Sequence, residues 1–228
     1  MTSSSVNQIP VVNLSPRTKY KKSVKPPSES MLKPGRNNAK LGDRVTRKHW
    51  QGMPIFSLTL EERATCPTDC EQWNNCYGNN MPFAHRYDHT HSNFYNYLFT
   101  HIWQLIKKHE QIVVRLHVLG DFVDAHYIDA WDKLLSTFPG LNVYGYTHHK
   151  LSTDLGQRIM ELNKLYTTRC RIRFSDDPTT SFAAYTPNNV PDNCDNAIIC
   201  PEQLGKTQSC ATCAYCWASD NPVIFLEH

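Results

Sequence analysis

The strongest constraint on the fold is the regular alternation of strand-like and helix-like segments after residue 53. Strand patterns cover residues 54–60, 112–119, 142–149, 169–175 and 197–200. Apolar residues recur at helical spacing between the earlier strands, most clearly after residue 126. Strands joined in this way form right-handed βαβ units, so we expect an α/β fold with a parallel sheet. About five strands are too few for a closed eight-stranded barrel. The pattern therefore predicts a partial parallel (βα) barrel or an open parallel sheet.

The predicted strands carry polar residues on one face. Arg115 and His117 alternate with apolar residues in one strand, and Arg173 and Ser175 do so in another. A parallel sheet that is covered on both faces reads instead as an almost continuous apolar run. We therefore expect a polar cavity, with a solvent-facing sheet surface as the alternative. For His117, an internal hydrogen-bond network is nearly as good an explanation as a functional role.

Helix-capping residues precede two of the helical patterns. Asp124 stands before the first and Thr153 before the second, and both residue types favour the N-cap position. We interpret Asp124 as a helix cap alone. A third cap is expected within residues 91–93.

The amino-terminal segment differs in charge from the rest of the chain. All charged residues of 1–50 except Glu29 and Asp43 are Lys or Arg, although the net charge of the whole chain is only +3. The segment also lacks apolar periodicity, so we expect residues 1–48 to form a flexible basic arm. Such an arm could bind nucleic acid through its phosphates, or it could be only a solubilising terminus.

No membrane association is expected. The sequence contains no apolar run of about eighteen residues and no leader-like apolar stretch near its start. We expect a cytoplasmic protein, in the host cytoplasm if a phage encodes it.

Cysteine is the most informative residue type, because nine cysteines in a chain without an export signal are poorly explained by disulfides. Two groups stand out. The first contains Cys66, Cys70 and Cys76, and the second contains Cys200, Cys210, Cys213 and Cys216. Cys170 and Cys194 stand alone, and we interpret both as small buried apolar residues.

Both groups fit a metal centre. Three thiolates holding a [4Fe–4S] cluster leave one iron open for a ligand, whereas His85 or His89 could complete a Cys3His zinc site instead. Four thiolates saturate a cluster or a zinc ion. The CxxCxxC run at 210–216 is close to ferredoxin spacing and lacks the two separated knuckles of structural zinc, which favours iron–sulfur for the second group.

A strand leads into Cys66, Cys70 and Cys76, a helix follows, and the next strand ends in Gly120-Asp121. This order of elements resembles the core of radical S-adenosylmethionine enzymes. The resemblance implies that Cys66, Cys70 and Cys76 hold a [4Fe–4S] cluster whose free iron binds the cofactor. It places Gly120 and Asp121 at the cofactor's amino group, and Ser175 or Asp176 near its ribose. It also implies a reductase as electron donor.

A closer resemblance joins RLHVLGDFVDAHYIDAW, the YGYTHH segment and CPEQLGKTQSCATCAYCW. Together they look like an uncharacterised bacteriophage family that is named after gene product eighty-eight. The similarity covers roughly residues 50–217 and implies no particular reaction.

Two functions remain open. In the first, an open cluster and S-adenosylmethionine act on nucleic acid or another anionic substrate in the polar cavity, where Arg115, His117, Arg173 and Asp121 form the reactive site. In the second, both cysteine groups are structural zinc or iron–sulfur sites of a non-enzymatic nucleic-acid-binding protein. We divide the chain into the arm of residues 1–48, a partial barrel core of residues 49–196, and a cysteine-rich cluster-binding segment of residues 197–228 that packs on the core.

Overall fold

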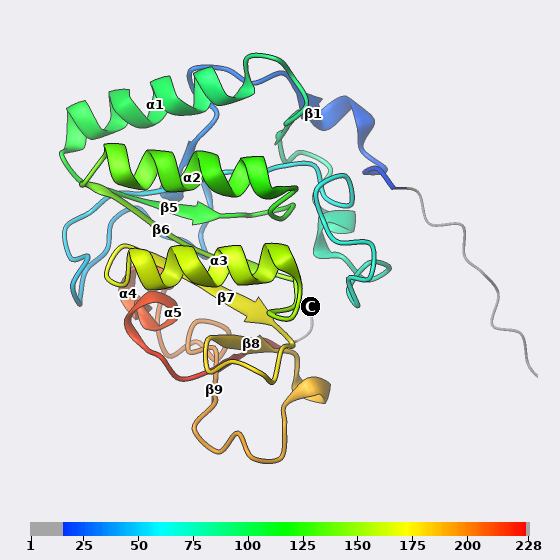
Figure 1. The fold of residues 1–228 in the computed structure, drawn as a ribbon. Helices are drawn as coiled ribbons and strands as arrows, with labels where there is room; N and C mark the ends of the chain where they lie inside the picture. The colour runs from blue at the N-terminus through cyan, green and yellow to red at the C-terminus, as the bar shows by residue number, and fades with distance from the viewer. Residues whose placement is uncertain (1–15, 227–228) are drawn as a thin grey trace, which may run out of the picture.

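Three helices pack against a mostly parallel sheet in the computed structural model, which describes residues 16–226 (Figure 1). Helix α1 spans Phe94–His109, α2 spans Ala125–Thr137 and α3 spans Asp154–Leu165. Two of the expected caps are confirmed, because Asp124 accepts a hydrogen bond from the Tyr127 amide and Thr153 accepts one from the Gly156 amide. Within the described residues, no helix has both the length and the apolarity needed to cross a bilayer.

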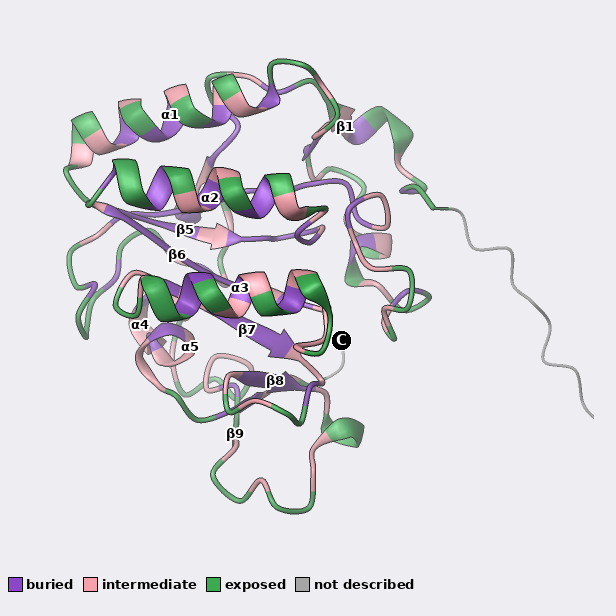
Figure 2. Ribbon diagram, in the orientation of Figure 1, coloured by how far each residue is buried: buried purple, intermediate pink, exposed green. Residues whose placement is uncertain are grey.

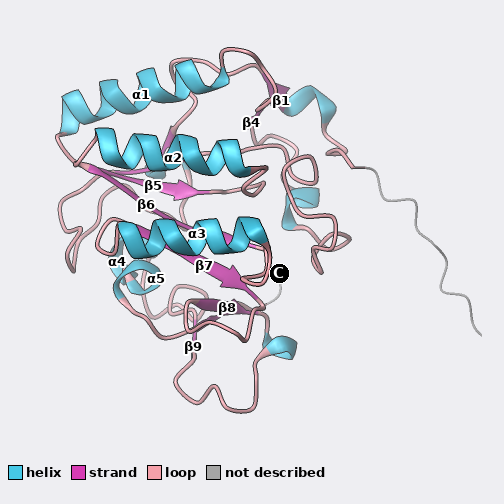
Figure 3. Ribbon diagram, in the orientation of Figure 1, coloured by secondary structure: helices cyan, strands magenta, loops and turns pink. Residues whose placement is uncertain are grey.

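Within residues 16–226 the main sheet has eight strands in the order β2-β3-β5-β6-β7-β8-β10-β9. Strands β5, β6, β7 and β8 follow one another in Figure 3. Only β2 is antiparallel to its neighbour. The strands are β2 (Lys33–Pro34), β3 (Ile55–Ser57), β5 (Ile112–Leu116), β6 (Leu141–Thr147), β7 (Cys170–Ser175), β8 (Ala183–Tyr185), β9 (Ile198–Ile199) and β10 (Val223–Ile224). A separate pair joins β1 (Val24–Lys25) to β4 (Arg86–Tyr87).

The mostly parallel α/β sheet is therefore confirmed, but a barrel is not. In residues 16–226, β2 and β9 are the two ends of the strand order, so the sheet is open. The short strands β8 and β10 are absent from our prediction, because two or three residues are too few for an alternating pattern to be recognised.

The order of the central strands leaves one face of the sheet free of long helices. Strands β3, β5, β6 and β7 lie side by side in chain order, so right-handed crossovers put α1, α2 and α3 on the same face (Figure 1). Ile112 and Val114 of β5 point into the core beneath these helices. Val113, between them, joins a second cluster with Trp50, Tyr144 and Trp217. The second face is therefore where a site can form.

The amino-terminal segment is folded from residue 16 onward, which corrects the expectation of a flexible arm over residues 1–48. Met31 and Leu41 are fully buried, and β2 extends the sheet beside β3. Buried and exposed residues alternate along this segment (Figure 2). The Leu32 amide also donates to Nδ1 of His101 in α1. These contacts are with distant parts of the chain, so they leave no periodic pattern in the local sequence. The first fifteen residues of the expected arm lie outside the described residues.

The carboxyl-terminal segment completes the second face of the sheet. Two short helices, α4 (Cys210–Cys213) and α5 (Tyr215–Ala218), follow one another there. The Cys210 and Ala211 amides donate to the carbonyls of Lys40 and Leu41, at 2.7 and 2.9 Å. The second cysteine group is thus fastened to the folded amino-terminal segment.

Within the described residues, four 3-10 helices lie in the loops, at Lys21–Ser23, Gly35–Asn37, Tyr77–Asn80 and Pro187–Asn189.

Candidate metal and substrate site

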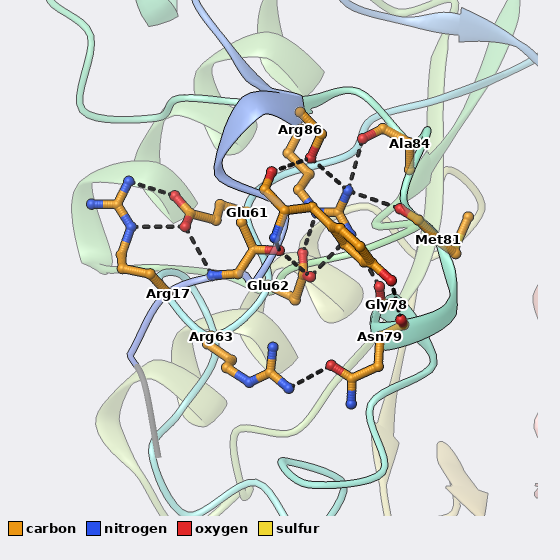
Figure 4. Close-up of polar contacts among 12 residues, drawn as sticks. Arg17, Glu61, Glu62, Arg63, Gly78, Asn79, Met81, Ala84 and Arg86 are labelled. Atoms are coloured by element: carbon orange, nitrogen blue, oxygen red, sulfur yellow. Dashed lines mark hydrogen bonds and ion pairs between the residues drawn. The ribbon is translucent and has the colours of Figure 1, made fainter. Parts of the chain in front are cut away.

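The first cysteine group lies on a long loop that follows β3. A buried ion pair between Glu62 and Arg86 joins the two ends of this loop (Figure 4). Arg86 is fully buried and meets Glu62 through two hydrogen bonds, from Nε to Oε2 at 2.5 Å and from Nη2 to Oε1 at 2.9 Å. A two-point contact between an arginine and a carboxylate is strong and sets the orientation of both groups.

Arg86 also holds the far end of the loop. It donates to the carbonyls of Gly78, Met81 and Ala84, which follow Cys76 in the chain. Glu62 accepts a further hydrogen bond from the Thr18 hydroxyl, at 2.7 Å. The loop that carries the cysteines is therefore tied to one buried guanidinium and to the amino-terminal segment.

All seven cysteines of the two groups line one cavity of about 750 Å³. Cys66 is near enough to Cys70 and Cys76 for their charges to interact, and the same holds between Cys216 and both Cys200 and Cys213. Neither Cys170 nor Cys194 belongs to the lining. The fold thus brings together, in one place, two groups that are more than a hundred residues apart in the chain.

The cavity lies over the free face of the sheet and at the carboxyl ends of its strands. Arg115 and Tyr144, neighbours in the β5–β6 register, form part of its wall. His117, Gly120 and Ser175, which follow or end strands, complete that side. Ligands of parallel α/β sheets bind at this position.

Arg115 stands between the two cysteine groups. Its charge interacts with Tyr77, next to Cys76, and with Cys210 of the second group. The guanidinium lies over the ring of Tyr146, at 5.7 Å from the ring centroid. Its Nε atom is buried and has no hydrogen-bond partner among the described residues.

His117 lines the cavity and is held from the helix side. Its Nε2 atom lies 2.7 Å from the hydroxyl of Tyr127 in α2, while its Nδ1 is buried without a partner in the described part of the chain. Burial, and then the charge of Arg115, lower the pKa of His117 to about 3. The imidazole is therefore neutral at pH 7.

Gly120 lines the cavity, but Asp121 does not. The Asp121 carboxylate accepts hydrogen bonds from the amides of Phe122 and His148, both at 2.7 Å, and the Asp121 amide donates to Thr65. Asp121 thus joins the ends of β5 and β6 to the first cysteine loop. Its expected place at a cofactor amino group stays a prediction.

Ser175 and Asp176 line the cavity, whereas Arg173 is used elsewhere. Arg173 donates to the carbonyls of Cys216, Ser219, Asn221 and Ala183, and it is 1% exposed. From the sequence we expect this residue in the reactive site for an anionic substrate. The structure corrects that role, because its donors hold the segment that contains Cys216. The carboxylate of Asp176 accepts from the Thr186 amide.

Burial makes five of the cavity thiols weak acids. It raises the pKa of both Cys70 and Cys210 to about 12, and it also raises the pKa values of Cys66, Cys76 and Cys216. Nearby thiols and, for Cys66, the charge of Asp121 add to the effect. Without a bound cation these thiols are neutral at pH 7.

Thiol groups supply the soft donor atoms of the cavity. In the described part of the chain, no three His, Cys, Asp or Glu side chains are close enough together to hold one metal ion. His85 and His89, our candidates for a fourth zinc ligand, do not line the cavity. In an iron–sulfur cluster each thiolate binds a different iron, so the ligands surround the cluster without sharing one coordination sphere. A set of seven soft thiolates fits that chemistry.

The sequence does not predict most of the aromatic wall of the cavity. Tyr144, Tyr146 and Trp217 belong to the lining, and the rings of Tyr144 and Trp217 lie 4.7 Å apart. The alternation in residues 142–149 could have placed Tyr144 and Tyr146 on one face. Trp217 follows the last cysteine directly, but no spacing rule distinguishes it from a core residue.

Comparison with known proteins places the chain in a family. The sequence model described as Gene product 88 matches residues 30–219. No significant match was found to a curated protein or to a solved structure. The match covers most of the chain, including both cysteine groups, and it confirms the resemblance to the bacteriophage family named after gene product eighty-eight. The resemblance to radical S-adenosylmethionine enzymes stays a prediction. The chain belongs to the Gene product 88 family.

Proposed function

We propose that this protein is an iron–sulfur enzyme of the radical S-adenosylmethionine type. Cys66, Cys70 and Cys76 would hold an open [4Fe–4S] cluster, and Cys200, Cys210, Cys213 and Cys216 a second one. One observation carries the proposal, namely that all seven cysteines of the two groups line one cavity while Cys170 and Cys194 do not. Clusters of thiols in this number are poorly explained by packing or by disulfides.

The arrangement of the strands supports the assignment. The first cysteine group follows β3, and β5, β6 and β7 come next in the same sheet in chain order, each after a helix. The Gly120 turn after β5 packs against Leu60 and Thr65 of the cysteine loop. A cofactor bound at the first group would therefore meet the ends of several neighbouring strands.

An open [4Fe–4S] cluster with S-adenosylmethionine supplies radical hydrogen abstraction. The residues of this chain would position its reactants. Gly120, Ser175 and Asp176 border the space beside the first group, and Arg115 presents a positive charge toward it. The tyrosine and tryptophan rings of the wall would exclude water from the reaction.

Two partners belong to the proposal. A cytoplasmic reductase would supply electrons. Nucleic acid would meet the basic amino-terminal segment, where Lys19, Lys21 and Lys22 are all exposed. Deletion of residues 1–48 would remove buried side chains such as Met31 as well, so charge substitution is the appropriate test of the nucleic-acid contact.

The test of the proposed function uses group-specific cysteine variants, purified without oxygen. We expect Cys70→Ala and Cys213→Ala each to lose about half of the bound iron and sulfide, because each disables one cluster. Cys194→Ser is the matched control and should keep the full content, since Cys194 is partly buried outside the cavity. Dithionite-dependent cleavage of S-adenosylmethionine should be lost in Cys70→Ala. Cys213→Ala should keep this activity or lose less of it.

Other outcomes would reject the proposal in separate parts. If the wild-type protein contains stoichiometric zinc and no iron, the proposed enzyme is rejected in favour of a structural metal protein that binds nucleic acid. If both groups bind iron but the protein does not cleave S-adenosylmethionine, the protein is an electron carrier and not an enzyme of this type.

A separate experiment tests the nucleic-acid contact. Triple substitution of Lys19, Lys21 and Lys22 by Gln should weaken salt-sensitive retention of DNA or RNA, and unchanged retention would remove nucleic acid as a partner of this surface.

A further inference from the structure

Buried polar atoms without partners gather around the cavity. Such atoms are rare and costly in folded proteins. Five residues of the lining each carry one that finds no partner within residues 16–226, namely Trp73 Nε1, Arg115 Nε, His117 Nδ1, Tyr144 OH and Trp217 Nε1. Arginine and tryptophan nitrogens can only donate hydrogen bonds. The ligand that satisfies this wall must therefore be rich in acceptor atoms.

The charge at the centre of the wall is not balanced by the protein. Carboxylates at the cavity have other partners, since Glu62 pairs with Arg86 and Glu202 lies 3.6 Å from Lys40. Asp176 accepts from the amide and hydroxyl of Thr186. For the Arg115 guanidinium, the described residues offer a tyrosine ring but no carboxylate. Arg115 is partly buried, and a partly buried cation without a counter-charge is unfavourable unless an anion joins it.

The two strongest donors of this wall are neighbours. Arg115 and Tyr144 are opposite one another in the β5–β6 register, and the ring of Tyr144 is fixed against Trp217. Tyr146, two residues further along β6, holds the guanidinium from one side. The donors are thus preorganised on rigid strands, as a selective binding site requires.

We propose that Arg115 and Tyr144 form an oxyanion subsite that binds the carboxylate or phosphate of a small-molecule substrate between the two cysteine groups. This deepens the proposed function by naming the substrate class, and it rests on that function only for the cavity being the place of reaction. The volume of about 750 Å³ is within the usual range for small-molecule sites. A carboxylate or a phosphate can take two parallel hydrogen bonds from a guanidinium, and these charge-assisted bonds are stronger than those to a neutral acceptor.

Binding of simple oxyanions tests the subsite independently of any reaction. Anaerobically purified full-length protein is titrated calorimetrically with inorganic phosphate, with adenosine monophosphate and with succinate. We expect at least one probe to bind, with affinity reduced about tenfold or more in Arg115→Gln and less strongly in Tyr144→Phe, which removes only the hydroxyl. Arg158→Gln is the control, because it removes an exposed cation that pairs with Asp129 on the helix face. Circular dichroism checks that each variant is folded.

Each result has one reading. Preference for phosphate probes identifies a phosphate-bearing substrate, and preference for succinate identifies a carboxylate. Binding that is equal in wild type and Arg115→Gln, or absent for all probes, overturns the subsite. Loss of iron in Arg115→Gln without any oxyanion binding by wild type would also overturn it, since Arg115 would then neutralise a cluster. If wild-type protein lacks iron but binds an oxyanion through Arg115, the proposed function fails and the subsite stands.

Discussion

At the residue scale, a side chain's partners decide its role more than its place in a pattern. Arg115 and Arg173 both lie on polar positions of alternating strands, yet one faces the cavity without a counter-charge and the other holds backbone carbonyls. Alternation predicts the face of a strand but not what lies opposite it. The sequence therefore predicts one role for both residues, whereas the structure places only Arg115 at the cavity.

The buried Glu62–Arg86 pair should be essential for the first cysteine loop. Glu62→Gln leaves a fully buried guanidinium without its counter-charge, so we expect a loss of about 3–5 kcal/mol in the free energy of unfolding. Asp129→Asn breaks an exposed pair with Arg158 and should cost under about 1 kcal/mol. Urea denaturation measures both. Equal small losses would show that the pair does not hold the loop.

Gly120 should be required for close packing as well as for its backbone conformation. Its φ is +85°, and an added Cβ would lie 2.6 Å from Thr65 Oγ1 and 2.7 Å from Leu60 Cβ. Gly52 has a φ of +90°, but a Cβ added to it would lie in open space. We expect Gly52→Ala to cost about 1–2 kcal/mol and Gly120→Ala to cost about 1–3 kcal/mol more in unfolding free energy. Identical denaturation midpoints would contradict the close approach of the cysteine loop.

At the scale of elements, the long helices and central strands follow from the sequence, while the short elements do not. Helices α2 and α3 begin at their expected caps, and β5, β6 and β7 lie within the expected strand segments or start one residue early. The folding of the amino-terminal segment could not be predicted, because its few apolar residues are buried by distant parts of the chain and not by neighbours in sequence. Its folding depends on tertiary contacts alone.

One of those contacts should make stability depend on pH. Burial, and then the charge of Lys33, lower the pKa of His101 to about 4, and its Nδ1 accepts a hydrogen bond from the Leu32 amide. The unfolded chain binds a proton at this residue below about pH 6.5, whereas the folded chain does so only near pH 4. Stability from His101 is therefore complete above pH 6.5 and falls between pH 6.5 and 4, by up to about 3 kcal/mol.

His101→Asn keeps an acceptor near the Leu32 amide but cannot titrate. Chemical denaturation at pH 7 and at pH 4.5 should show a smaller decrease in stability for this variant than for wild type. Other buried histidines act equally in both proteins, so the difference isolates His101. The same decrease in both proteins would mean that His101 does not link the amino-terminal segment to α1 in this way.

At the scale of the whole molecule, the fold explains how distant cysteines meet. Sequential parallel strands place three helices on one face, and the other face receives the carboxyl-terminal segment and the cysteine loop. The two cysteine groups, the parallel sheet and the polar side chains along its strands follow from the sequence. The shared cavity and its aromatic wall do not, because they depend on how the loop after β3 and the helices α4 and α5 pack together.

Metal analysis of the anaerobically purified wild-type protein tests this account most directly. Two clusters predict about eight iron and about eight sulfide per chain with little zinc, and a brown protein whose visible absorbance falls on reduction. A colourless protein containing one or two zinc ions, or no metal at all after anaerobic reconstitution with iron and sulfide, would contradict it.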